Sequence, residues 1–471
     1  MRSSQAKNPV NASAFQLEAR LSQRKSLSAV VGLGYVGLPL AVEIANSGYD
    51  VVGIDLSQHV VDTINAGRSH IADVAHELVN GHVQTGRLRA STDAAALAQC
   101  DTICVCVPTP LNKIKDPDLS FVIAAATSIR DHLRAGQLII LESTTYPGTT
   151  REVFLPILEQ SGLKLDEDFF VCFSPERVDP GNTKWHTRNT PKVIGGLTQP
   201  SVDMGVHFYG SIFETMVPVE SAEAAELVKV YENTFRMVNI ALANEMAMTC
   251  DRLGLDVWGV IEAAATKPFG FMKFTPGPGL GGHCIPLDPH YLSWKMRTLE
   301  FKTRLIELAS EINSDMPGYV VRKVASALND TSRALRGSWI LVLGIAYKKD
   351  INDMRESPAL EIIRLLQQGG AQVLYHDPHC DIIEDDGHTR ITGLPMRSVP
   401  LTPGLLAALD AAVIVTDHTA VDYEEVAAHA ALVVDTRGVM RNIKSRARLV
   451  GLSGTETVPV NEMPPIYAIA G

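Results

Sequence analysis

The chain has 471 residues, of which 46% are hydrophobic and 20% are charged, and such values are typical of a globular protein with large cores. Because this length exceeds that of one ordinary domain, we expect two or three domains. The net charge of −11 argues against a nucleic-acid binder, since such proteins need a basic surface that displaces counterions from phosphates. A small phosphate-bearing ligand is not excluded, because a few cations and backbone amides can hold one.

The seven cysteines are an odd number and are scattered through a long chain. Cys104 and Cys106 form a C-x-C pair, but no second pair or nearby histidine completes a zinc site, so no metal is predicted. Reduced thiols in a reducing compartment are therefore expected. Since the sequence shows neither a membrane-spanning apolar run nor the apolar core of a signal peptide, we predict a cytoplasmic protein without a membrane partner.

Residues 1–26 are polar and lack a clear pattern, and we interpret them as an N-terminal extension. From residue 27 to residue 217, short apolar runs alternate with helical segments, which is typical of a parallel sheet covered by helices. The predicted strands of this first α/β domain are Ser28–Val31, Val51–Ile54, Thr102–Val107, Leu138–Leu141, Phe169–Phe173 and Lys192–Ile194.

A long helix is predicted next, from about Ser221 to Leu253. Apolar residues recur there at spacings of three and four, and no proline or glycine interrupts them before Gly254, which indicates a helix with one buried face. The positions expected on that face are Ala225, Val228, Tyr231, Phe235, Val238, Leu242 and Met246. Such a helix after a complete α/β set suggests a helical middle domain, residues 218–316, that can also form a dimer interface.

A second α/β set follows in residues 317–471. Its predicted strands are Ile340–Leu343, Gln372–Tyr375, Ala412–Val415 and Leu432–Val434. The predicted fold class is therefore α/β, with two doubly wound, Rossmann-like domains joined by a helical middle domain that contains one long helix.

A G-x-G-x-x-G motif lies between the first predicted strand and the helix Leu38–Ser47. In this motif the first glycine permits a tight turn, the second lets the backbone approach a pyrophosphate, and the third lets helix and strand pack closely. Asp55 ends the next strand, where a carboxylate can accept both ribose hydroxyls and would repel a 2′-phosphate, so NAD is favoured over NADP. A glycine turn that binds nothing is the competing interpretation. The predicted cofactor contacts are Gly32, Gly34, Tyr35, Val36, Gly37 and Asp55, with Thr109 and Thr144 at later strand ends, where ordinary turn chemistry is the alternative.

The segment from Gly277 to Asp288 contains four glycines and two prolines within ten residues, so it cannot be the interior of a helix or strand. Cys284 lies in this loop, four residues before Asp288, and is a candidate nucleophile. A buried structural role is commoner for a lone cysteine, and it suits Cys104, Cys106 and Cys172, which lie on predicted strands. His283 adjoins the thiol, but neighbouring loop side chains usually point apart.

A dehydrogenase with a nucleophilic cysteine can oxidise an alcohol twice. The first hydride transfer yields an aldehyde, a thiolate adds to it, and the resulting hemithioacetal can lose a second hydride to become a thioester that water cleaves. On the long helix, Lys229 and Asn233 are four residues apart and share one face. The lysine can hold an alkoxide and the asparagine can orient it or a water, although a solvated helix face is an equal alternative.

These motifs together resemble the UDP-glucose/UDP-N-acetylhexosamine 6-dehydrogenase family over nearly everything after residue 27. The matching motifs are Gly32–Gly37 with Asp55, Glu142–Thr144, Phe173–Glu176, Lys229–Asn233, Gly281–Asp288, Gly344–Lys348 and Arg355–Pro358. The resemblance implies an NAD-binding Rossmann domain in residues 27–217, a dimerising helical domain in residues 218–316 and a UDP-binding Rossmann-like domain in residues 317–471. It also implies a homodimer or higher homo-oligomer.

The resemblance implies roles for individual residues. Cys284 is the nucleophile, and Lys229 stabilises negative charge on the C6 oxygen of the sugar. Asn233 and Asp288 organise Lys229 and a water, and Glu176 assists formation or hydrolysis of the thioester. The implied substrate contacts are the loop residues Gly277 and Gly281, together with Arg177, Arg236, Lys348 and Arg355, the last of which reaches the UDP from the same or a partner subunit.

The sequence departs from the UDP-glucose branch at three places. Leu287 stands where that branch usually has lysine, Arg236 stands where it is usually apolar, and residues 177–182 also differ. All three features are similar to the N-acetylhexosamine branch, in which an arginine can receive an acetamido carbonyl. Residues 108–113 are closest to enzymes of UDP-N-acetylglucosamine, so we predict four-electron, NAD-dependent oxidation of that sugar for surface-polysaccharide synthesis.

Other readings stay open. UDP-N-acetylmannosamine, UDP-N-acetylgalactosamine and UDP-glucose would undergo the same chemistry. A two-electron dehydrogenase of the hydroxyacid or 6-phosphogluconate type would leave the cysteine loop and the second α/β domain unexplained. A nucleotide-sensing scaffold would not need Lys229, Asn233, Cys284 and Asp288 together.

Overall fold

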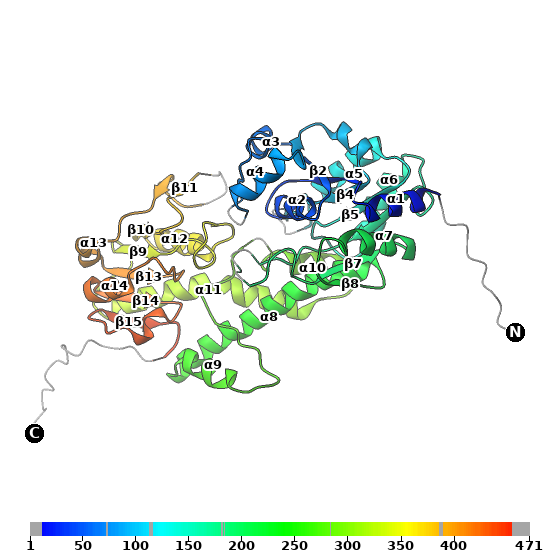
Figure 1. The fold of residues 1–471 in the computed structure, drawn as a ribbon. Coiled ribbons are helices and arrows are strands. Elements are labelled where there is room, and N and C mark those ends of the chain that lie inside the picture. The colour runs from blue at the N-terminus through cyan, green and yellow to red at the C-terminus, as the bar shows by residue number, and fades with distance from the viewer. Residues whose placement is uncertain are drawn as a thin grey trace, which may run out of the picture. The chain divides into compact units, whose positions relative to one another are not determined.

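The computed structural model describes residues 12–71, 74–112, 116–179, 182, 184–282, 284–385 and 390–454. His283 and parts of the segments 108–113 and 177–182 lie outside the described residues. The chain divides into two compact units (Figure 1). Unit 1 contains the residues up to Glu232 together with His290–Phe301, and unit 2 contains Asn233–Pro289 and the residues from Lys302 onward.

Unit 1 is built around an eight-stranded sheet with the order β3-β2-β1-β4-β5-β6-β7-β8. Neighbouring strands pair in parallel except β6 with β7, which are antiparallel. Among the described residues between these two strands no helix occurs, and an antiparallel pair needs no helical crossover. The strands are β1 (Leu27–Val31), β2 (Asp50–Ile54), β3 (Leu88–Ser91), β4 (Thr102–Val105), β5 (Gln137–Leu141), β6 (Phe169–Phe173), β7 (Lys192–Gly196) and β8 (Met216–Pro218).

Helices cover both faces of this sheet, because successive strand residues point to opposite faces. Val30 and Cys104 belong to one core and Ala29 and Ile103 to the other. The helical segments of unit 1 are α1 (Ala12–Ser22), α2 (Gly37–Asn46), α3 (Gln58–Asn65), α4 (His76–Gln84), η1 (Ala94–Gln99), α5 (Ser120–His132), η2 (Thr150–Phe154), α6 (Leu155–Glu159) and α7 (Gln199–Tyr209).

Two segments at a distance in sequence complete unit 1. Helix α1 comes from the predicted extension, and its Leu17 and Leu21 are fully buried in the core, so residues 12–22 belong to the fold. Helix α10 (Asp288–Thr298) returns from the cysteine loop. There the hydroxyl of Tyr291 donates to the carbonyl oxygen of Thr109, and Lys295 forms an ion pair with Glu152 at 2.7 Å.

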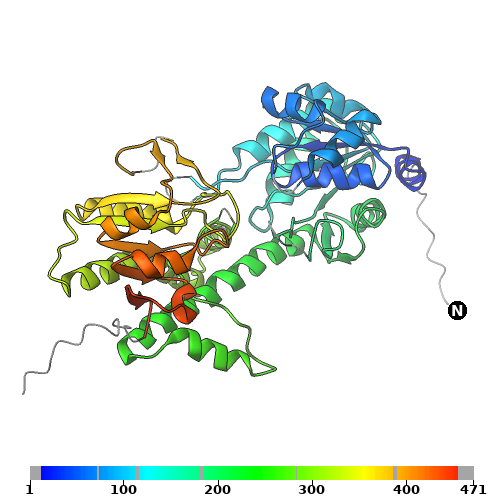
Figure 2. The same cartoon turned by 60° about the vertical axis from the view of Figure 1, so that its left-hand side comes forward.

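Unit 2 contains a five-stranded, wholly parallel sheet with the order β10-β9-β13-β14-β15, drawn in yellow to red in Figure 2. Its strands are β9 (Trp339–Leu343), β10 (Gln372–His376), β13 (Ala411–Ile414), β14 (Leu432–Asp435) and β15 (Arg448–Gly451), and β11 (Ile382–Ile383) pairs with β12 (Met396–Arg397) apart from them. Its helical segments include α9 (Val257–Ala265), α11 (Arg304–Asn329), α12 (Pro358–Gln368), α13 (Pro403–Ala408), α14 (Tyr423–His429) and η3 (Val439–Asn442).

Helix α8 (Ala222–Leu253) is one uninterrupted helix of 32 residues, as predicted, but its buried stripe is not the predicted apolar one. Of the predicted positions only Ala225 is buried, whereas Tyr231 and Leu242 keep 67% and 54% of their surface exposed. The buried stripe includes Ala222, Glu226, Val230, Asn233, Met237, Ala241 and Asn244. Its polar members are buried because each has a hydrogen-bond partner, a property that hydrophobic periodicity does not detect.

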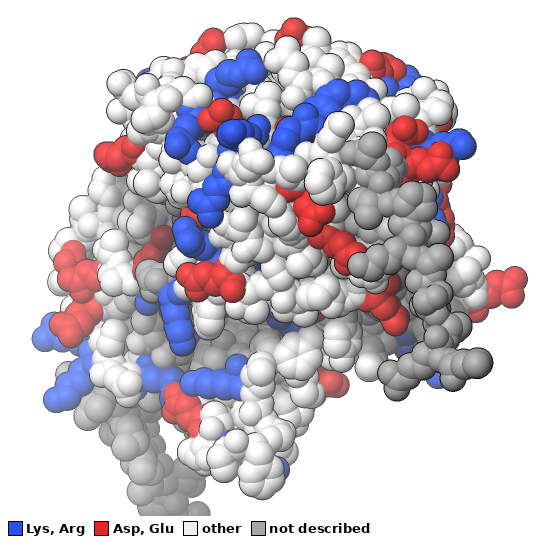
Figure 3. All heavy atoms as spheres, turned by 45° about the vertical axis from the view of Figure 1, so that its right-hand side comes forward, with Lys and Arg blue, Asp and Glu red and all other residues white. Residues whose placement is uncertain are grey.

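The surface carries charge of both signs. Figure 3 shows both basic and acidic side chains on one face of the molecule. Among the helices of the described residues, none combines the length and the apolar character that a membrane crossing requires.

Candidate active site

The three glycines of the motif after β1 are explained by different features of the structure. Gly32 has a φ of +86°, and a Cβ atom there would lie 2.7 Å from the carbonyl oxygen of Cys106. A Cβ atom on Gly37 would lie 1.8 Å from the carbonyl oxygen of Gly32, whereas one on Gly34 would meet nothing within 4 Å. The protein itself thus requires Gly32 and Gly37, and the space beside Gly34 fits the close approach of a ligand.

Asp55, directly after β2, faces this turn. Its Oδ2 accepts the backbone N–H of Leu33 at 2.8 Å, and its Oδ1 accepts that of Ser57 at 2.9 Å. Helix α2 begins beside it with Val36 as N-cap, which supplies no side-chain cap, so its first N–H groups suit an anion. Tyr35, between the glycines, is 44% exposed. This arrangement fits the ribose and pyrophosphate of NAD.

The two predicted threonines lie at the same edge of the sheet, beyond the carboxyl ends of β4 and β5. The carbonyl oxygen of Thr109 accepts the hydroxyl of Tyr291, which fixes its loop to α10. Thr144 is half-buried, two residues after the buried Glu142. In sheets of this kind ligands bind at the carboxyl ends of strands, so both positions suit cofactor contacts.

Glu176 lies shortly after β6, and its Oε1 accepts the backbone N–H groups of Arg177 and Val178, both at 2.7 Å. Burial alone would raise the pKa of Glu176, but Lys192, the Val178 N–H and Lys229 on α8 outweigh it and lower that pKa. The guanidinium of Arg177 points elsewhere: its Nη2 donates to Glu232 at 2.5 Å. Unit 1 therefore places an ionised carboxylate within the electrostatic influence of Lys229.

Cys284 differs from the other six cysteines, which are buried, because it is half-buried. Burial raises the pKa of Cys100 and Cys104 to about 12, so those thiols are poor nucleophiles. The backbone N–H of Asp288 donates to the Cys284 carbonyl at 2.8 Å, which forms one turn leading into α10. Asp288 is buried, and its Oδ2 accepts the amide of Asn233 at 2.5 Å. Unit 2 therefore joins the predicted carboxylate and amide by a hydrogen bond, one turn after the predicted nucleophile Cys284.

The glycines before Cys284 fix the loop within unit 2. The N–H of Gly277 donates to the side chain of Asn244 at 2.9 Å, and that of Gly282 donates to the carbonyl oxygen of Arg355 at 3.0 Å. A Cβ atom on Gly281 would lie 2.5 Å from the Cβ atom of Tyr347. The glycines thus let the loop lie directly against the segments that follow β9 and precede α12.

The predicted substrate cations of unit 2 have different surroundings. Arg355 is exposed and pairs with Asp353 at 2.6 Å. Lys348 is half-buried after β9, and Arg236 is exposed on α8. No ligand is needed to hold Arg355 in place, but its pairing with Asp353 must be exchanged or shared when it binds a phosphate.

Arg437 is a candidate that sequence analysis missed. It follows β14, its Nε donates to the carbonyl oxygen of Val415 at 2.7 Å, and a Cβ atom on Gly277 would lie 2.7 Å from its Nη1. A half-buried guanidinium against the glycine loop suits an anionic ligand. Arg437 stands just beyond a predicted strand end, where ligands gather in this fold class, but its closeness to Gly277 depends on the fold.

One cluster of potential metal ligands occurs among the described residues, namely Asp350, His379 and His418. His418 is fully buried; its Nδ1 accepts the backbone N–H of Asp350, and its Nε2 donates to Asp377, both at 3.0 Å. Because both ring nitrogens are engaged, His418 has no lone pair left for a metal ion. The cluster therefore has a structural role.

Comparison with known proteins gives a consistent result. Three models of the UDP-glucose/GDP-mannose dehydrogenase family match the chain: the NAD binding domain over residues 27–213, the central domain over residues 223–315 and the UDP binding domain over residues 341–442. The chain is 35% identical to the UDP-N-acetyl-D-mannosamine dehydrogenase of Methanococcus maripaludis over 396 residues, which cover 83% of this chain and 86% of the relative.

Two further relatives have informative names. The UDP-N-acetyl-D-glucosamine 6-dehydrogenase of Pseudomonas aeruginosa is 37% identical over 353 residues, covering 74% of this chain and 82% of the relative. The solved structure of a UDP-D-ManNAc dehydrogenase from Pyrococcus horikoshii has a TM-score of 0.82 and 33% identity, covering 90% of this chain and 99% of that one.

Proposed function

We propose that this chain, which belongs to the UDP-glucose/GDP-mannose dehydrogenase family and is an NAD-dependent UDP-sugar dehydrogenase, oxidises the C6 hydroxymethyl group of UDP-N-acetyl-D-glucosamine to a carboxylate. The reaction removes four electrons in two steps and uses two NAD per sugar. Its uronate product is a precursor of surface polysaccharide. The enzyme works in the cytoplasm, where reducing conditions keep its nucleophilic thiol reduced.

The observation that carries this proposal is the half-buried Cys284, in a glycine loop with the Asn233–Asp288 pair at its end. NAD supplies the hydride acceptor in each oxidation. In the first step C6 loses a hydride and its hydroxyl loses a proton, while Lys229 stabilises the negative charge on the oxygen. The thiolate of Cys284 then adds to the aldehyde carbon, and loss of a second hydride leaves a thioester on Cys284.

Water completes the reaction. It attacks the thioester carbon, the C–S bond breaks, and the thiol of Cys284 is restored as the carboxylate leaves. Glu176 suits the removal of a proton from that water, because its lowered pKa keeps it ionised. Asp288 and Asn233, joined by their hydrogen bond, orient the groups that handle protons around Cys284.

The acetamido sugar is proposed from Arg236, Arg177 and the leucine at 287. Arg236 is exposed on α8 and can receive an acetamido carbonyl, whereas the side chain of Arg177 is bound to Glu232 and is better suited to shaping the site. A second candidate substrate is UDP-N-acetyl-D-mannosamine, since relatives of similar identity have that name. The two sugars differ only in configuration at C2.

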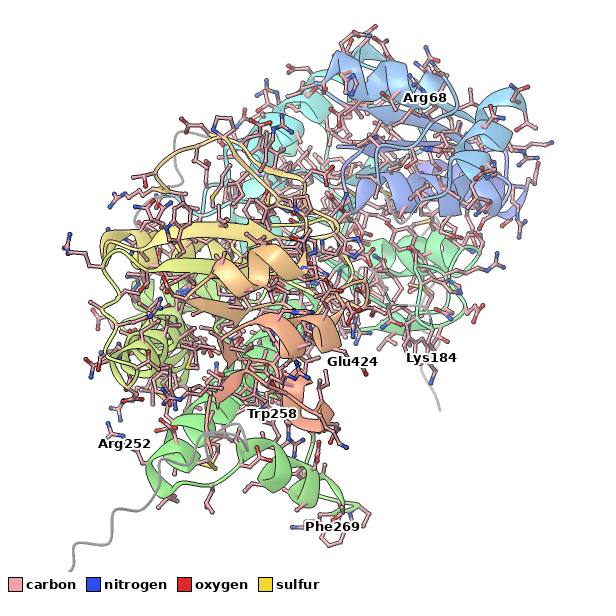
Figure 4. All side chains as sticks on the ribbon, turned by 90° about the vertical axis from the view of Figure 1, so that its left-hand side faces the viewer. Arg68, Lys184, Arg252, Trp258, Phe269 and Glu424 are labelled. Carbon is pink, nitrogen blue, oxygen red and sulfur yellow. The ribbon has the colours of Figure 1, made fainter. Side chains whose placement is uncertain are left out.

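We further propose that the enzyme is a homodimer. Large apolar side chains are exposed in the helical part of unit 2, and a monomeric protein rarely exposes so many. They include Phe235, Leu242, Met246, Phe269, Phe271, Met272, Leu305 and Leu308, and Figure 4 shows Phe269 projecting from the loop after α9. Sedimentation analysis of Leu242→Asp should show loss of the dimer. If the sedimenting mass is unchanged, α8 does not form the dimer interface.

The reaction is tested by counting NADH formed to completion from each of four sugars: UDP-N-acetylglucosamine, UDP-N-acetylmannosamine, UDP-N-acetylgalactosamine and UDP-glucose. Two NADH per UDP-N-acetylglucosamine, with little from the others, is expected. Cys284→Ala should abolish uronate formation, and Cys250→Ala, which removes a thiol outside the loop, should not. Two NADH from another sugar would change the substrate assignment but not the mechanism. Full uronate formation by Cys284→Ala would refute the thioester mechanism.

A further inference from the structure

Lys192, the first residue of β7, is an almost completely buried cation whose side chain is 3% exposed. Lysine is rarely buried unless it is paired. Its Nζ donates to Oε2 of Glu142 at 2.5 Å and to the carbonyl oxygen of Pro175 at 3.2 Å, and it lies 3.6 Å from Oε2 of Glu176. One buried positive charge is thus shared between two carboxylates.

The two carboxylates differ in their surroundings. Glu142, directly after β5, has a fully buried side chain, and its Oε1 accepts the hydroxyl of Tyr209 at 2.5 Å. Burial raises the pKa of Glu142, but its Oε2 lies 2.5 Å from the ammonium group of Lys192, and this ion pair favours the charged form. We therefore assign it as ionised. The side chain of Glu176 keeps 16% exposure and is the only one of the pair that can reach a reacting water.

We propose that the buried Glu142–Lys192 pair is a positioning device for Glu176, in which Lys192 keeps the Glu176 carboxylate ionised and oriented, and thereby sets the lower pH limit of the reaction. The inference rests on the proposed function, because it assumes that Glu176 acts in the acyl steps. Sequence analysis had treated Glu142 only as part of a motif and had given Lys192 no role.

The other charged and titratable groups around Glu176 also affect its ionisation. Lys229, from α8, favours the ionised form. Glu142, a like charge paired with the same lysine, opposes it. Cys106, at the end of β4, is neutral because burial raises its pKa well above the ordinary value. The Arg177 guanidinium is paired with Glu232. Lys192 is therefore the nearest full positive charge that faces Glu176 from within the core.

Replacing Lys192 and replacing Glu142 should shift the pKa of Glu176 in opposite directions. Lys192→Met removes an opposite charge within about 4 Å and should raise the pKa of Glu176 by roughly 1–3 units. Glu142→Gln removes a like charge, so it should lower the pKa of Glu176 by a smaller amount. Lys192→Arg retains the charge and should restore behaviour close to the parent. A purely structural role would move all three variants in the same direction.

The measurement is a pH titration of the Glu176 carboxyl carbon by NMR, in full-length enzyme labelled with ¹³C-carboxyl glutamate. Glu176→Gln identifies its resonance. The acid limb of NADH formation against pH is recorded in parallel. If Lys192→Met does not fold, the double variant Glu142→Gln/Lys192→Met removes both buried charges together and is expected to titrate between Lys192→Met and the parent.

The outcomes separate this inference from the proposed function. A higher pKa of Glu176 in Lys192→Met, with the acid limb moved to higher pH, supports both. A moved pKa with an unmoved acid limb retains the positioning role but removes Glu176 from the reaction. An unchanged pKa of Glu176 in Lys192→Met or the double variant, or equal shifts in Lys192→Met and Glu142→Gln, overturns the inference.

Discussion

The two main sheets contain the same glycine turn after a central strand, but the aspartates beside the two turns have different surroundings. Gly32 and Gly344 both follow a central strand and have positive φ. Each lies against the carbonyl oxygen of a residue just beyond the neighbouring strand, Cys106 and Thr416 respectively. An aspartate ends the adjacent strand in each sheet. In unit 1, Asp55 accepts two backbone N–H groups and remains partly exposed. In unit 2, Asp377 is buried.

The difference lies in how many donors reach each aspartate. Asp377 accepts four backbone N–H groups, from Ile345, Ala346, His379 and Cys380, and the imidazole of His418. A carboxylate has about four lone-pair sites, so Asp377 has no capacity left for ribose hydroxyls, whereas Asp55 does. Topology alone therefore does not make a dinucleotide site; the number of free acceptor positions on the acid does.

The largest expected effect concerns stability. Asp377→Ala leaves four N–H groups without an acceptor, three of them on buried residues. It should destabilise the protein by about 3–5 kcal/mol, since each unsatisfied buried group costs about 1–3 kcal/mol. Asp55→Ala, which frees two N–H groups near solvent, should cost about 1 kcal/mol or less. Thermal unfolding midpoints measured by calorimetry compare the two. Equal decreases of the unfolding midpoint in the two variants would show that the two aspartates do not differ in their contribution to stability.

The next effect concerns NAD affinity. Asp55→Ala should weaken NAD binding by about 1.5–3 kcal/mol, the value of hydrogen bonds to a charged group, and should narrow the preference over NADP. Titration of protein fluorescence with each dinucleotide measures both. Asp62→Ala, which removes an exposed acid on α3, is the matched control. Unchanged affinity in Asp55→Ala would show that the open carboxylate does not serve the ribose.

The glycines sharpen the same contrast. Gly37→Ala should destabilise the protein by about 1–3 kcal/mol through overpacking, because its Cβ atom would overlap the Gly32 carbonyl. Gly34→Ala meets open space and should leave the unfolding midpoint nearly unchanged while weakening NAD binding. Both variants are compared by calorimetry and by NAD titration. Normal NAD affinity in Gly34→Ala would place the pyrophosphate elsewhere.

The smallest effect is a pH dependence. Burial alone would raise the pKa of Asp377, but His418 and the backbone donors outweigh it and lower that pKa to about 2. The unfolded chain has an aspartate pKa of about 3.9, so protonation favours unfolding. This contribution is present above about pH 4 and is lost as pH falls toward 2. The denaturant midpoint of Asp377→Asn should therefore fall less than that of the parent protein as the pH is lowered from about 4 toward 2. If the two proteins show the same dependence of midpoint on pH, the assignment to Asp377 is wrong.

Most of the fold could be predicted because central strands are short, apolar and bounded by turn residues. The three main-sheet strands that were missed, β3, β8 and β15, are all edge strands. Leu88-Arg89-Ala90-Ser91 shows why, since an edge strand is buried on fewer sides and tolerates polar residues. The stripe of α8 was misjudged because Glu226 and Asn233 are buried through hydrogen bonds rather than apolar character.

The site was predictable where its chemistry lies in local motifs. Asn233 and Asp288 are 55 residues apart in sequence, yet their hydrogen bond joins two motifs that the sequence had already marked. Lys192 and Arg437 were not singled out because their significance depends on distant partners, Glu142 for one and the Gly277 loop for the other. A lone lysine in a strand or an arginine after one has no periodicity that distinguishes it from a surface residue.

Helix α10 constrains the order in which the chain can fold during synthesis. Tyr291 and Lys295 attach it to unit 1, so that unit is not complete until α10 has left the ribosome. By then α8, α9 and the loop of Cys284 have already emerged, because they precede α10 in the chain. A nascent or truncated chain therefore cannot finish its nucleotide-binding half without also carrying the thiol, which couples the two in biosynthesis.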